Sequence, residues 1–304
     1  MTGAGGAAGP GRAPFGVRLG AAMSEHGPLC VGIDPHASLL AAWGLGDDAA
    51  GLRRFALTVL DAVGGRVAAV KPQSAFFERH GAAGVAVLEE VVAAGRDTGT
   101  LVVVDAKRGD IGSTMGGYAD AYLRDGSPLA GDALTVSPYL GFGSIAPAVE
   151  AALATGRGLF VLALTSNPEG AAVQHARDSG DVAVAARVAR EAAALNATEL
   201  DRLGARAGSA GVAAMGSVGL VVGATIGDAA RRLGVDLAAV RGPLLAPGVG
   251  AQGAGPAELA EVFGDARATV LASSSRGVLQ AGPDVGALRD AARRSADAAG
   301  AALS

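Results

Sequence analysis

The stretch Leu-Val-Val-Val-Asp-Ala-Lys-Arg-Gly-Asp-Ile-Gly-Ser-Thr, residues 101–114, joins an apolar run to a charged loop. Its first four residues are β-formers and predict a buried strand. Because the side chains of a strand alternate between its faces, Asp105 and Lys107 are expected to point the same way. Asp110 follows in a loop that leads into a helix beginning near Ser113. Carboxylates and an ammonium thus gather at the carboxyl end of a strand, where α/β proteins bind ligands; the competing interpretation is a solvated turn.

Outside this stretch, apolar runs that predict strands alternate with segments of helical periodicity. The predicted strands cover residues 29–33, 67–70, 101–104, 133–136, 159–164, 219–222, 243–245 and 269–272. Helices are predicted over residues 53–63, 85–94, 182–203, 256–262 and 288–299. About eight βα units in a chain of this length predict an α/β fold, a closed (β/α)8 TIM barrel; a doubly wound open sheet is the alternative.

The ends of the predicted barrel and one internal segment depart from this alternation. Residues 1–14 are rich in glycine and alanine and are expected to form a disordered tail, without the apolar core of a signal peptide. Residues 15–304 are expected to form one barrel domain. Between the fifth and sixth strands, the Gly/Ala/Ser run of residues 204–216 predicts a flexible insertion. No apolar run reaches the length that spans a membrane.

The composition limits the classes of protein and partner. Half of the 304 residues are hydrophobic, which allows a large core. The net charge of −4 and the lack of a long basic run argue against binding to nucleic acid or to an acidic membrane. A single cysteine, Cys30, excludes a disulfide framework within the chain and predicts a buried thiol in a reducing compartment, the cytoplasm.

Polar and ionisable residues follow the predicted strands, and a barrel brings all of these strand ends around one mouth. They are Asp34, Lys71, Asp105, Lys107, Asp110 and Ser137 after the first four strands, and residues 247–253, Ser275 and Arg276 after the last two. The sequence therefore predicts an active site at this mouth.

A glycine-rich loop after the seventh strand permits two interpretations. Gly248-x-Gly250-x-x-Gly253 matches the dinucleotide-binding pattern, but it does not follow a first strand. In barrels, phosphate sites lie after the seventh and eighth strands, where backbone N–H groups face the anion. Arg276 would supply a permanently charged partner for that phosphate. A monophosphate site is favoured over a nicotinamide cofactor.

The residues at the strand ends also resemble a known family. Asp105-Ala106-Lys107-Arg108-Gly109-Asp110-Ile111 closely resembles the signature of orotidine 5'-phosphate decarboxylases. The segments Lys71-Pro72-Gln73, Thr135 to Gly141 and Thr165 to Gly170 are similar to the longer bacterial (type 2) subgroup of that family. The similarity runs in matching order from about Gly16 to about Gly282, which is nearly the whole chain.

The resemblance implies a homodimeric TIM barrel of the ribulose-phosphate-binding type with shared active sites. It implies a carboxy-lyase that converts the nucleotide orotidine 5'-monophosphate to UMP and carbon dioxide, the last step of de novo pyrimidine nucleotide synthesis. Neither a metal nor a cofactor is implied.

Roles for individual residues follow from the same resemblance. Lys107 would protonate C6 of the pyrimidine, with Asp105 beside the departing carboxylate. Asp110, Ile111 and Thr114 would reach into the neighbouring subunit's site. The other implied substrate-binding residues are Asp34 and Lys71 at the ribose, Ser137 at the pyrimidine, and Pro247, Val249, Gln252, Ser275 and Arg276 towards the phosphate.

Two other functions are compatible with a barrel of this kind. A related sugar-phosphate aldolase or decarboxylase would generally need magnesium, so activity in EDTA distinguishes it. A non-catalytic phosphate-binding barrel would not need the intact set of Lys71, Asp105, Lys107 and Asp110. The four histidines of the chain have no metal-ligand spacing.

Overall fold

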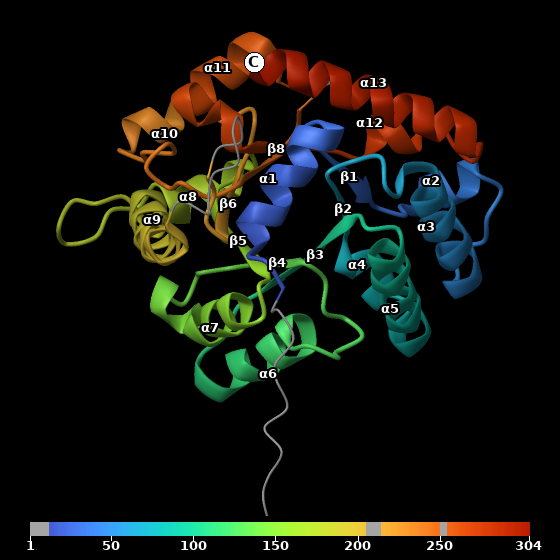
Figure 1. Ribbon diagram of the computed structural model, residues 1–304, viewed down its shortest axis with the longest axis horizontal. Helices are drawn as coiled ribbons and strands as arrows, with labels where there is room; N and C mark the ends of the chain where they lie inside the picture. The colour runs from blue at the N-terminus through green and yellow to red at the C-terminus, as the bar shows by residue number, and fades with distance from the viewer. Residues whose placement is uncertain (1–11, 205–213, 250–253) are drawn as a thin grey trace, which may run out of the picture.

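A computed structural model describes residues 12–204, 214–249 and 254–304 of the chain. Within these residues, parallel strands close into one barrel in the order β1 to β8 (Figure 1). The strands are β1 (Leu29–Ile33), β2 (Ala69–Pro72), β3 (Leu101–Arg108), β4 (Ala133–Val136), β5 (Gly158–Leu164), β6 (Val218–Val222), β7 (Leu244–Pro247) and β8 (Val270–Ser274). The predicted TIM barrel is confirmed, and the doubly wound open sheet is wrong, because β1 pairs with both β2 and β8.

The predicted strands all occur, with two informative differences in their bounds. Strand β2 is displaced towards its carboxyl end, so that Lys71 lies inside the strand. Strand β3 continues to Arg108, four residues beyond the apolar run that predicted it. The apolar run ends before the strand does, because Asp105 bridges to Gln73, just after β2, and Arg108 pairs with Val136 of β4.

Helices surround the barrel and follow the strands in sequence (Figure 1). They are α1 (Phe15–His26), α2 (Ala37–Ala42), α3 (Ala49–Val63), α4 (Ser74–Glu78), α5 (Gly81–Asp97), α6 (Gly112–Leu123), α7 (Ala146–Ala154), α8 (Ala171–Gln174), α9 (Val184–Leu203), α10 (Ala229–Arg232), α11 (Pro256–Phe263), α12 (Arg276–Leu279) and α13 (Val285–Leu303). Short 3-10 turns cover Phe142–Ile145, Pro168–Gly170 and Gly264–Thr269. Each predicted helix is confirmed, and α6 begins one residue before Ser113.

The apolar core has two parts. The larger part lies between the strands and the surrounding helices. The smaller part fills the barrel and includes Cys30, Val103 and Phe160, together with Phe15 and Leu19 of α1. The rings of Phe15 and Phe160 meet edge to face with centroids 5.9 Å apart. Helix α1 therefore closes the amino end of the barrel with apolar side chains.

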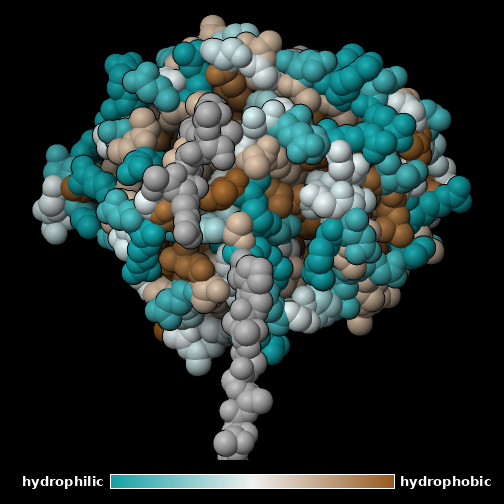
Figure 2. Space-filling model, viewed as in Figure 1, coloured by the Kyte–Doolittle hydropathy of each residue, from teal (hydrophilic) through white to brown (hydrophobic). Residues whose placement is uncertain are grey.

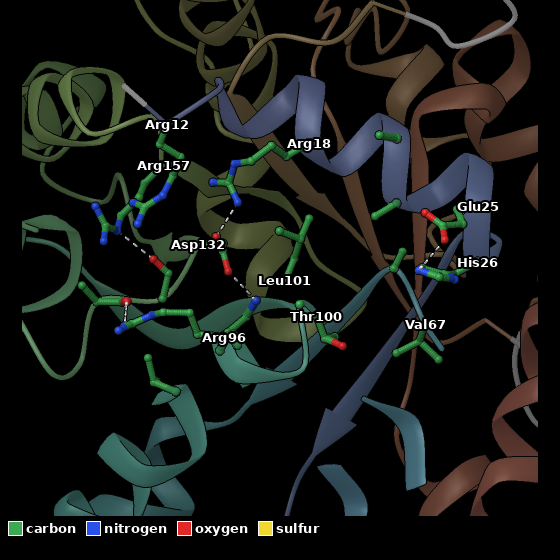
Figure 3. Close-up of a pocket in the computed structure, with 18 residues that line it drawn as sticks. Arg12, Arg18, Glu25, His26, Val67, Arg96, Thr100, Leu101, Asp132 and Arg157 are labelled. Carbon is green, nitrogen blue, oxygen red and sulfur yellow. Dashed lines mark hydrogen bonds and ion pairs between the residues drawn. The ribbon is translucent and has the colours of Figure 1, made fainter. Parts of the chain in front are cut away.

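Charged side chains complete this closure at the amino end (Figure 3). Arg18 of α1 forms an ion pair with Asp132 and donates to the carbonyl of Gly156 at 2.9 Å. The other carboxylate oxygen of Asp132 accepts the backbone N–H of Val102 at 3.0 Å. A cavity of about 460 Å³ lies between these groups. These contacts tie α1 to the amino ends of β3 and β5.

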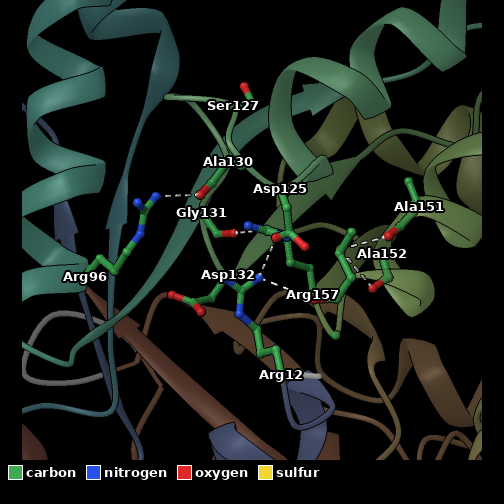
Figure 4. A network of polar contacts seen from close by, with 12 residues as sticks. Arg12, Arg96, Asp125, Ser127, Ala130, Gly131, Asp132, Ala151, Ala152 and Arg157 are labelled. Atoms are coloured by element: carbon green, nitrogen blue, oxygen red, sulfur yellow. Dashed lines mark hydrogen bonds and ion pairs between the residues drawn. The ribbon is translucent and has the colours of Figure 1, made fainter. Parts of the chain in front are cut away.

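A second arginine lies deeper in the same region (Figure 4). Arg157 is buried, and its Nε donates to the carbonyl of Gly131 at 2.8 Å. Its Nη1 donates to Asp125 at 2.6 Å, and Arg12 contacts the same carboxylate. The amino end thus uses its cations to satisfy carbonyl and carboxylate oxygens of the fold itself.

Two predictions fall mainly on residues that are not described. They are the disordered tail, of which residues 1–11 lie outside the described ranges, and the flexible run of residues 204–216, of which 205–213 do. Every described helix is too short or too polar to cross a membrane. On the face seen in Figure 2, hydrophilic residues predominate and hydrophobic ones form separate patches between the helices.

Candidate active site

Two lysines share one buried carboxylate at the carboxyl end of the barrel. Lys71 Nζ lies 2.7 Å from Asp105 Oδ2, and Lys107 Nζ lies 2.6 Å from Asp105 Oδ1. Asp105 and Lys71 are buried, whereas the side chain of Lys107 is 44% exposed. The cluster therefore presents one ammonium to the mouth and keeps its other two charges inside the barrel.

The pKa values of this cluster follow from its geometry. Burial alone would raise the pKa of Asp105, but the ammonium groups of Lys71 and Lys107 outweigh it and lower that pKa to about 2. Burial alone would lower the pKa of Lys71, but the carboxylates of Asp105 and Asp34 outweigh it and raise that pKa to about 12. Asp105 and Lys71 are thus both charged across the physiological pH range.

The sequence contains two lysines, Lys71 and Lys107. Its other cationic side chains are arginine or histidine. An ammonium can give up a proton during a reaction, whereas a guanidinium remains charged in proteins. The chain therefore pairs both of its lysine ammonium groups with one carboxylate.

Strand alternation predicts that Asp105 and Lys107 share a face, and the structure brings their side chains together. The backbone geometry differs from a regular strand, because Lys107 has a φ of 47°. The pairing of β3 with β4 also shifts its register between Val104 and Arg108. A bulge near an active site re-aims a side chain, and here it turns Lys107 back towards Asp105.

Asp34 and Ser275 lie beside this cluster, at the ends of β1 and β8. A Cβ on Gly32 would stand 2.0 Å from Ser275 Oγ and 3.0 Å from Asp34 Oδ2, so glycine lets these two side chains approach the strand closely. Asp34 Oδ1 is buried, and no described residue forms a hydrogen bond with it. A buried carboxylate oxygen without a partner favours a ligand that donates a hydrogen bond.

The residues predicted to reach a second subunit lie on an exposed loop and the start of α6. Asp110 Oδ1 accepts the N–H of Ile111, and no contact joins Asp110 to either lysine within the described chain. Thr114 is exposed. Ile111, Tyr139 and Leu140 are 61%, 75% and 55% exposed at this same end. Within the described residues, Asp110 thus forms no ion pair with the lysines of its own chain.

The residues predicted for the phosphate lie at the ends of β7 and β8, which are neighbours. Pro247 pairs with Ser273 across these strands. Arg276 begins α12 and is exposed, as is Pro247, and Val249 is partly buried. Gln252 lies outside the described residues.

Ser137 follows β4 on the other side of the cluster. Its N–H donates to the carbonyl of Arg108 at 2.8 Å, which holds the ends of β3 and β4 together.

Three residues at this mouth were missed by the sequence analysis as parts of the site. Thr135 Oγ1 donates to Asp105 Oδ1 at 2.8 Å, and Gln73 Nε2 donates to Asp105 Oδ2 at 3.2 Å. Arg108 pairs with Glu78 of α4. Both Thr135 and Gln73 occur in segments that carried the family resemblance, but spacing alone does not reveal that they contact Asp105.

The mouth contains a cavity of about 340 Å³ beside this cluster. It is lined by Gln73, Ser74, Ala75, Phe76, Glu78, Asp105, Ala106, Lys107 and Arg108. Among the described residues, no group of three His, Cys, Asp or Glu side chains is arranged to hold a metal ion.

Comparison with known proteins gives a consistent result. The model of the "Orotidine 5'-phosphate decarboxylase / HUMPS family" matches residues 27–291. An orotidine 5'-phosphate decarboxylase from Salinispora arenicola is 60% identical over 280 residues, covering 92% of this chain and 95% of the relative. One from Streptomyces coelicolor is 59% identical over 281 residues, with the same coverage of 92% and 95%.

Solved structures agree with these sequence matches. A crystal structure from Streptomyces avermitilis shares 58% identity with a TM-score of 0.87, covering 97% of both chains. The structure of Leishmania donovani OMP decarboxylase shares 29% identity with a TM-score of 0.69, covering 95% of this chain and 98% of that one.

Proposed function

This chain belongs to the orotidine 5'-phosphate decarboxylase family, and we propose that Lys107, Asp105, Lys71 and Asp110 carry out its chemistry. The reaction follows from the family and from the names of its relatives: the chain is a carboxy-lyase that converts orotidine 5'-monophosphate to UMP and carbon dioxide. The observation that carries the assignment of residues is the single exposed ammonium of Lys107, held on a buried carboxylate at the mouth of the barrel.

The difficulty of this reaction lies in the electron pair that carbon dioxide leaves at C6. That pair lies in the plane of the ring, so the π-system does not delocalise it, and a fixed positive charge nearby has to stabilise it. Lys107 supplies such a charge and then gives its proton to C6. Because Asp105 holds the ammonium in place before the reaction, little reorganisation is needed in the transition state.

The remaining strand ends would bind the parts of the substrate that do not react. Asp34 and Lys71 would hydrogen-bond to ribose hydroxyls, and the unpartnered Asp34 Oδ1 supports this role. Arg276 and Gln252 would hold the phosphate, together with the Pro247 to Val249 segment and Ser275. Ser137 would contact the pyrimidine. Binding energy from the phosphate and ribose would hold C6 against Lys107.

We propose that two chains share each site in a homodimer. In the described part of the chain, Asp110 forms no ion pair with either lysine, although it has the charge to complete their network. Ile111, Tyr139 and Leu140 expose apolar surface beside it, which a partner would cover. Asp110 of the partner subunit would then approach Lys107, with Ile111 and Thr114 at the same interface.

A reducing, cytoplasmic location is proposed for the same chain. Its single thiol, Cys30, is completely buried, and burial raises its pKa to about 12, so it is not a reactive or bridging cysteine.

The test is to follow the loss of orotidine 5'-monophosphate absorbance with purified protein in EDTA. We expect turnover without added metal. Absence of turnover, or turnover only after magnesium is restored, would contradict the proposal and favour a metal-dependent sugar-phosphate barrel.

A further inference from the structure

We infer that Thr135 is a positioning residue, whose hydroxyl sets the place of the Lys107 ammonium by binding both the backbone of Lys107 and the carboxylate of Asp105. The inference rests on the proposed function, because it concerns how the proton donor of that reaction is held. Thr135 lies in β4, outside the charged cluster itself, and it is 1% exposed.

The two hydrogen bonds of the Thr135 hydroxyl determine where its hydroxyl proton points. Lys107 N donates to Thr135 Oγ1 at 2.9 Å, and Thr135 Oγ1 lies 2.8 Å from Asp105 Oδ1. The carboxylate is ionised and can only accept, so the hydroxyl proton points to Asp105. The hydroxyl therefore links the backbone of one charged residue to the side chain of the other.

The backbone around Lys107 shows why such a link is needed. Val104 pairs with Leu134, so a regular register would pair Val136 with Ala106, but Val136 pairs with Arg108 instead. Strand β3 thus carries extra residues opposite Thr135, and Lys107 lies among them. Its φ of 47° lies in the left-handed region, which is unfavourable for a lysine. The bond to Thr135 stabilises this conformation.

The orientation of Asp105 depends on the same hydroxyl. Its Oδ1 accepts from Lys107 Nζ and Thr135 Oγ1, and its Oδ2 accepts from Lys71 Nζ and Gln73 Nε2. With donors on both oxygens, the carboxylate plane is fixed. Loss of the Thr135 hydroxyl would leave Oδ1 with the Lys107 ammonium as its remaining donor and would release the Lys107 backbone N–H, so the ammonium would lose its alignment with the substrate.

The experiment compares three variants. Thr135→Val removes the hydroxyl and keeps the shape, and Thr135→Ser keeps the hydroxyl. The matched control is Thr100→Val at the amino end, because Thr100 is 3% exposed and its Oγ1 likewise accepts a backbone N–H, that of Gly65 at 2.6 Å. We expect Thr135→Val to lower kcat by about 10- to 100-fold with little change in KM, since it loses a hydrogen bond to a charged group. Thr135→Ser and Thr100→Val should retain kcat.

A second readout does not depend on turnover. Labelling with [15N]lysine gives backbone signals from Lys71 and Lys107 alone, because the sequence has no other lysine. We expect the Lys107 amide to exchange with solvent faster in Thr135→Val, and at the wild-type rate in Thr135→Ser and Thr100→Val. If Thr135→Val does not fold, Thr135→Ala takes its place in both measurements.

The outcomes separate this inference from the proposed function. A wild-type kcat in Thr135→Val, or an equal loss in Thr135→Ser, overturns the positioning role. Unchanged Lys107 amide exchange in Thr135→Val overturns it as well. If the wild-type protein itself does not decarboxylate orotidine 5'-monophosphate, the proposed function fails, while the amide exchange still tests whether Thr135 holds Lys107.

Discussion

The two ends of the barrel both contain networks of cations and carboxylates, but they use them differently. At the amino end, Arg18 and Arg157 bind Asp132, Asp125 and backbone carbonyl groups of the fold (Figures 3 and 4). At the carboxyl end, the cluster of Lys71, Asp105 and Lys107 leaves one ammonium exposed at the mouth. At the amino end, these arginines are paired with acceptors of the protein. At the carboxyl end, the Lys107 ammonium is exposed and Asp34 Oδ1 has no hydrogen-bond partner among the described residues.

The pairing of donors and acceptors within the fold can therefore distinguish a structural charge network from one that binds a ligand. A structural network matches its donors to acceptors of the fold, as Arg18 does with Asp132 and the Gly156 carbonyl. The network that we propose as catalytic keeps a charged group, Lys107, and a buried acceptor, Asp34, available to a ligand. The cations of the two networks also differ, because Arg18 and Arg157 form the amino-end network, whereas two lysines contact Asp105.

The largest effect is expected from Lys107→Ala, which removes the proposed proton donor. We expect kcat to fall by about 1000-fold or more, because both a fixed charge and a proton are lost. Binding of a phosphate-bearing substrate analogue should survive in part, because the phosphate residues are unchanged. Steady-state kinetics and calorimetric titration with the analogue measure the two effects.

Two controls sharpen this result. Lys107→Arg keeps the positive charge, but a guanidinium does not release a proton in proteins, so this variant should also be nearly inactive. Arg12→Ala removes an exposed cation of the amino-end network and should leave kcat unchanged. Near wild-type turnover in Lys107→Ala would mean that the exposed ammonium is not the catalytic group.

The fold could be predicted well because its strands and helices are each visible as short patterns in the sequence. Each strand is a short apolar run, and the alternation of strands and helices leaves few topologies besides a barrel. The prediction was weakest at the end of β3, where the strand continues through Asp105, Lys107 and Arg108. Pairing partners on β2 and β4 hold this charged segment in the sheet, and a pattern of hydrophobicity does not contain them.

The candidate site could be predicted in part for the same reason. Parallel strands bring their carboxyl ends together, so Lys71 and Asp105 could be expected to be neighbours, and they form an ion pair. The bulge at Lys107 and the hydroxyl of Thr135 could not be predicted, because they depend on the register between β3 and β4. The periodicity of a sequence predicts which face of a strand a side chain lies on, but it does not predict a shift in the register between two strands.

The second-largest effect is expected from mixing two inactive variants, which tests whether a second chain completes the active site. Asp110→Ala and Lys107→Ala should each be nearly inactive as homodimers. Mixing the two inactive variants in equal amounts, with exchange of subunits, should restore about a quarter of wild-type activity, because half of the dimers are mixed and each has one intact site. No recovery in mixtures shown by mass spectrometry to contain the mixed dimer would contradict shared sites.

At the amino end, the expected effect is on stability and not on turnover. Asp132→Ala removes the carboxylate partner of Arg18 and the acceptor of the Val102 N–H, which should lower the free energy of unfolding by about 1–3 kcal/mol. The kcat of the folded variant should remain at the wild-type value. Urea unfolding and steady-state kinetics measure both quantities.

Asp125→Asn serves as the milder comparison, because the Asp125 side chain is 69% exposed and solvent screens its pairs. We expect it to cost less stability than Asp132→Ala. A large fall in kcat in either variant would show that the amino-end network is not purely structural.

The smallest effect concerns the acid limit of stability. The pKa of Asp105 lies at about 2 instead of 3.8, because Lys71 and Lys107 outweigh the opposing effect of burial. A carboxylate with a lowered pKa in the folded state stabilises the fold above its unfolded pKa, and this contribution is lost as the pH falls through the folded pKa. In Lys107→Ala, one of the two ammonium groups is absent, so the pKa of Asp105 rises towards 3.8 and Asp105 contributes less stability that can be lost as the pH falls. Urea midpoints measured between about pH 5 and about pH 3 should therefore fall less steeply in Lys107→Ala than in wild type, with Arg12→Ala following the wild-type curve. If Lys107→Ala and wild type fall together, the exposed ammonium contributes nothing to holding Asp105 ionised, and the contrast between the two ends of the barrel would rest on Lys71 alone.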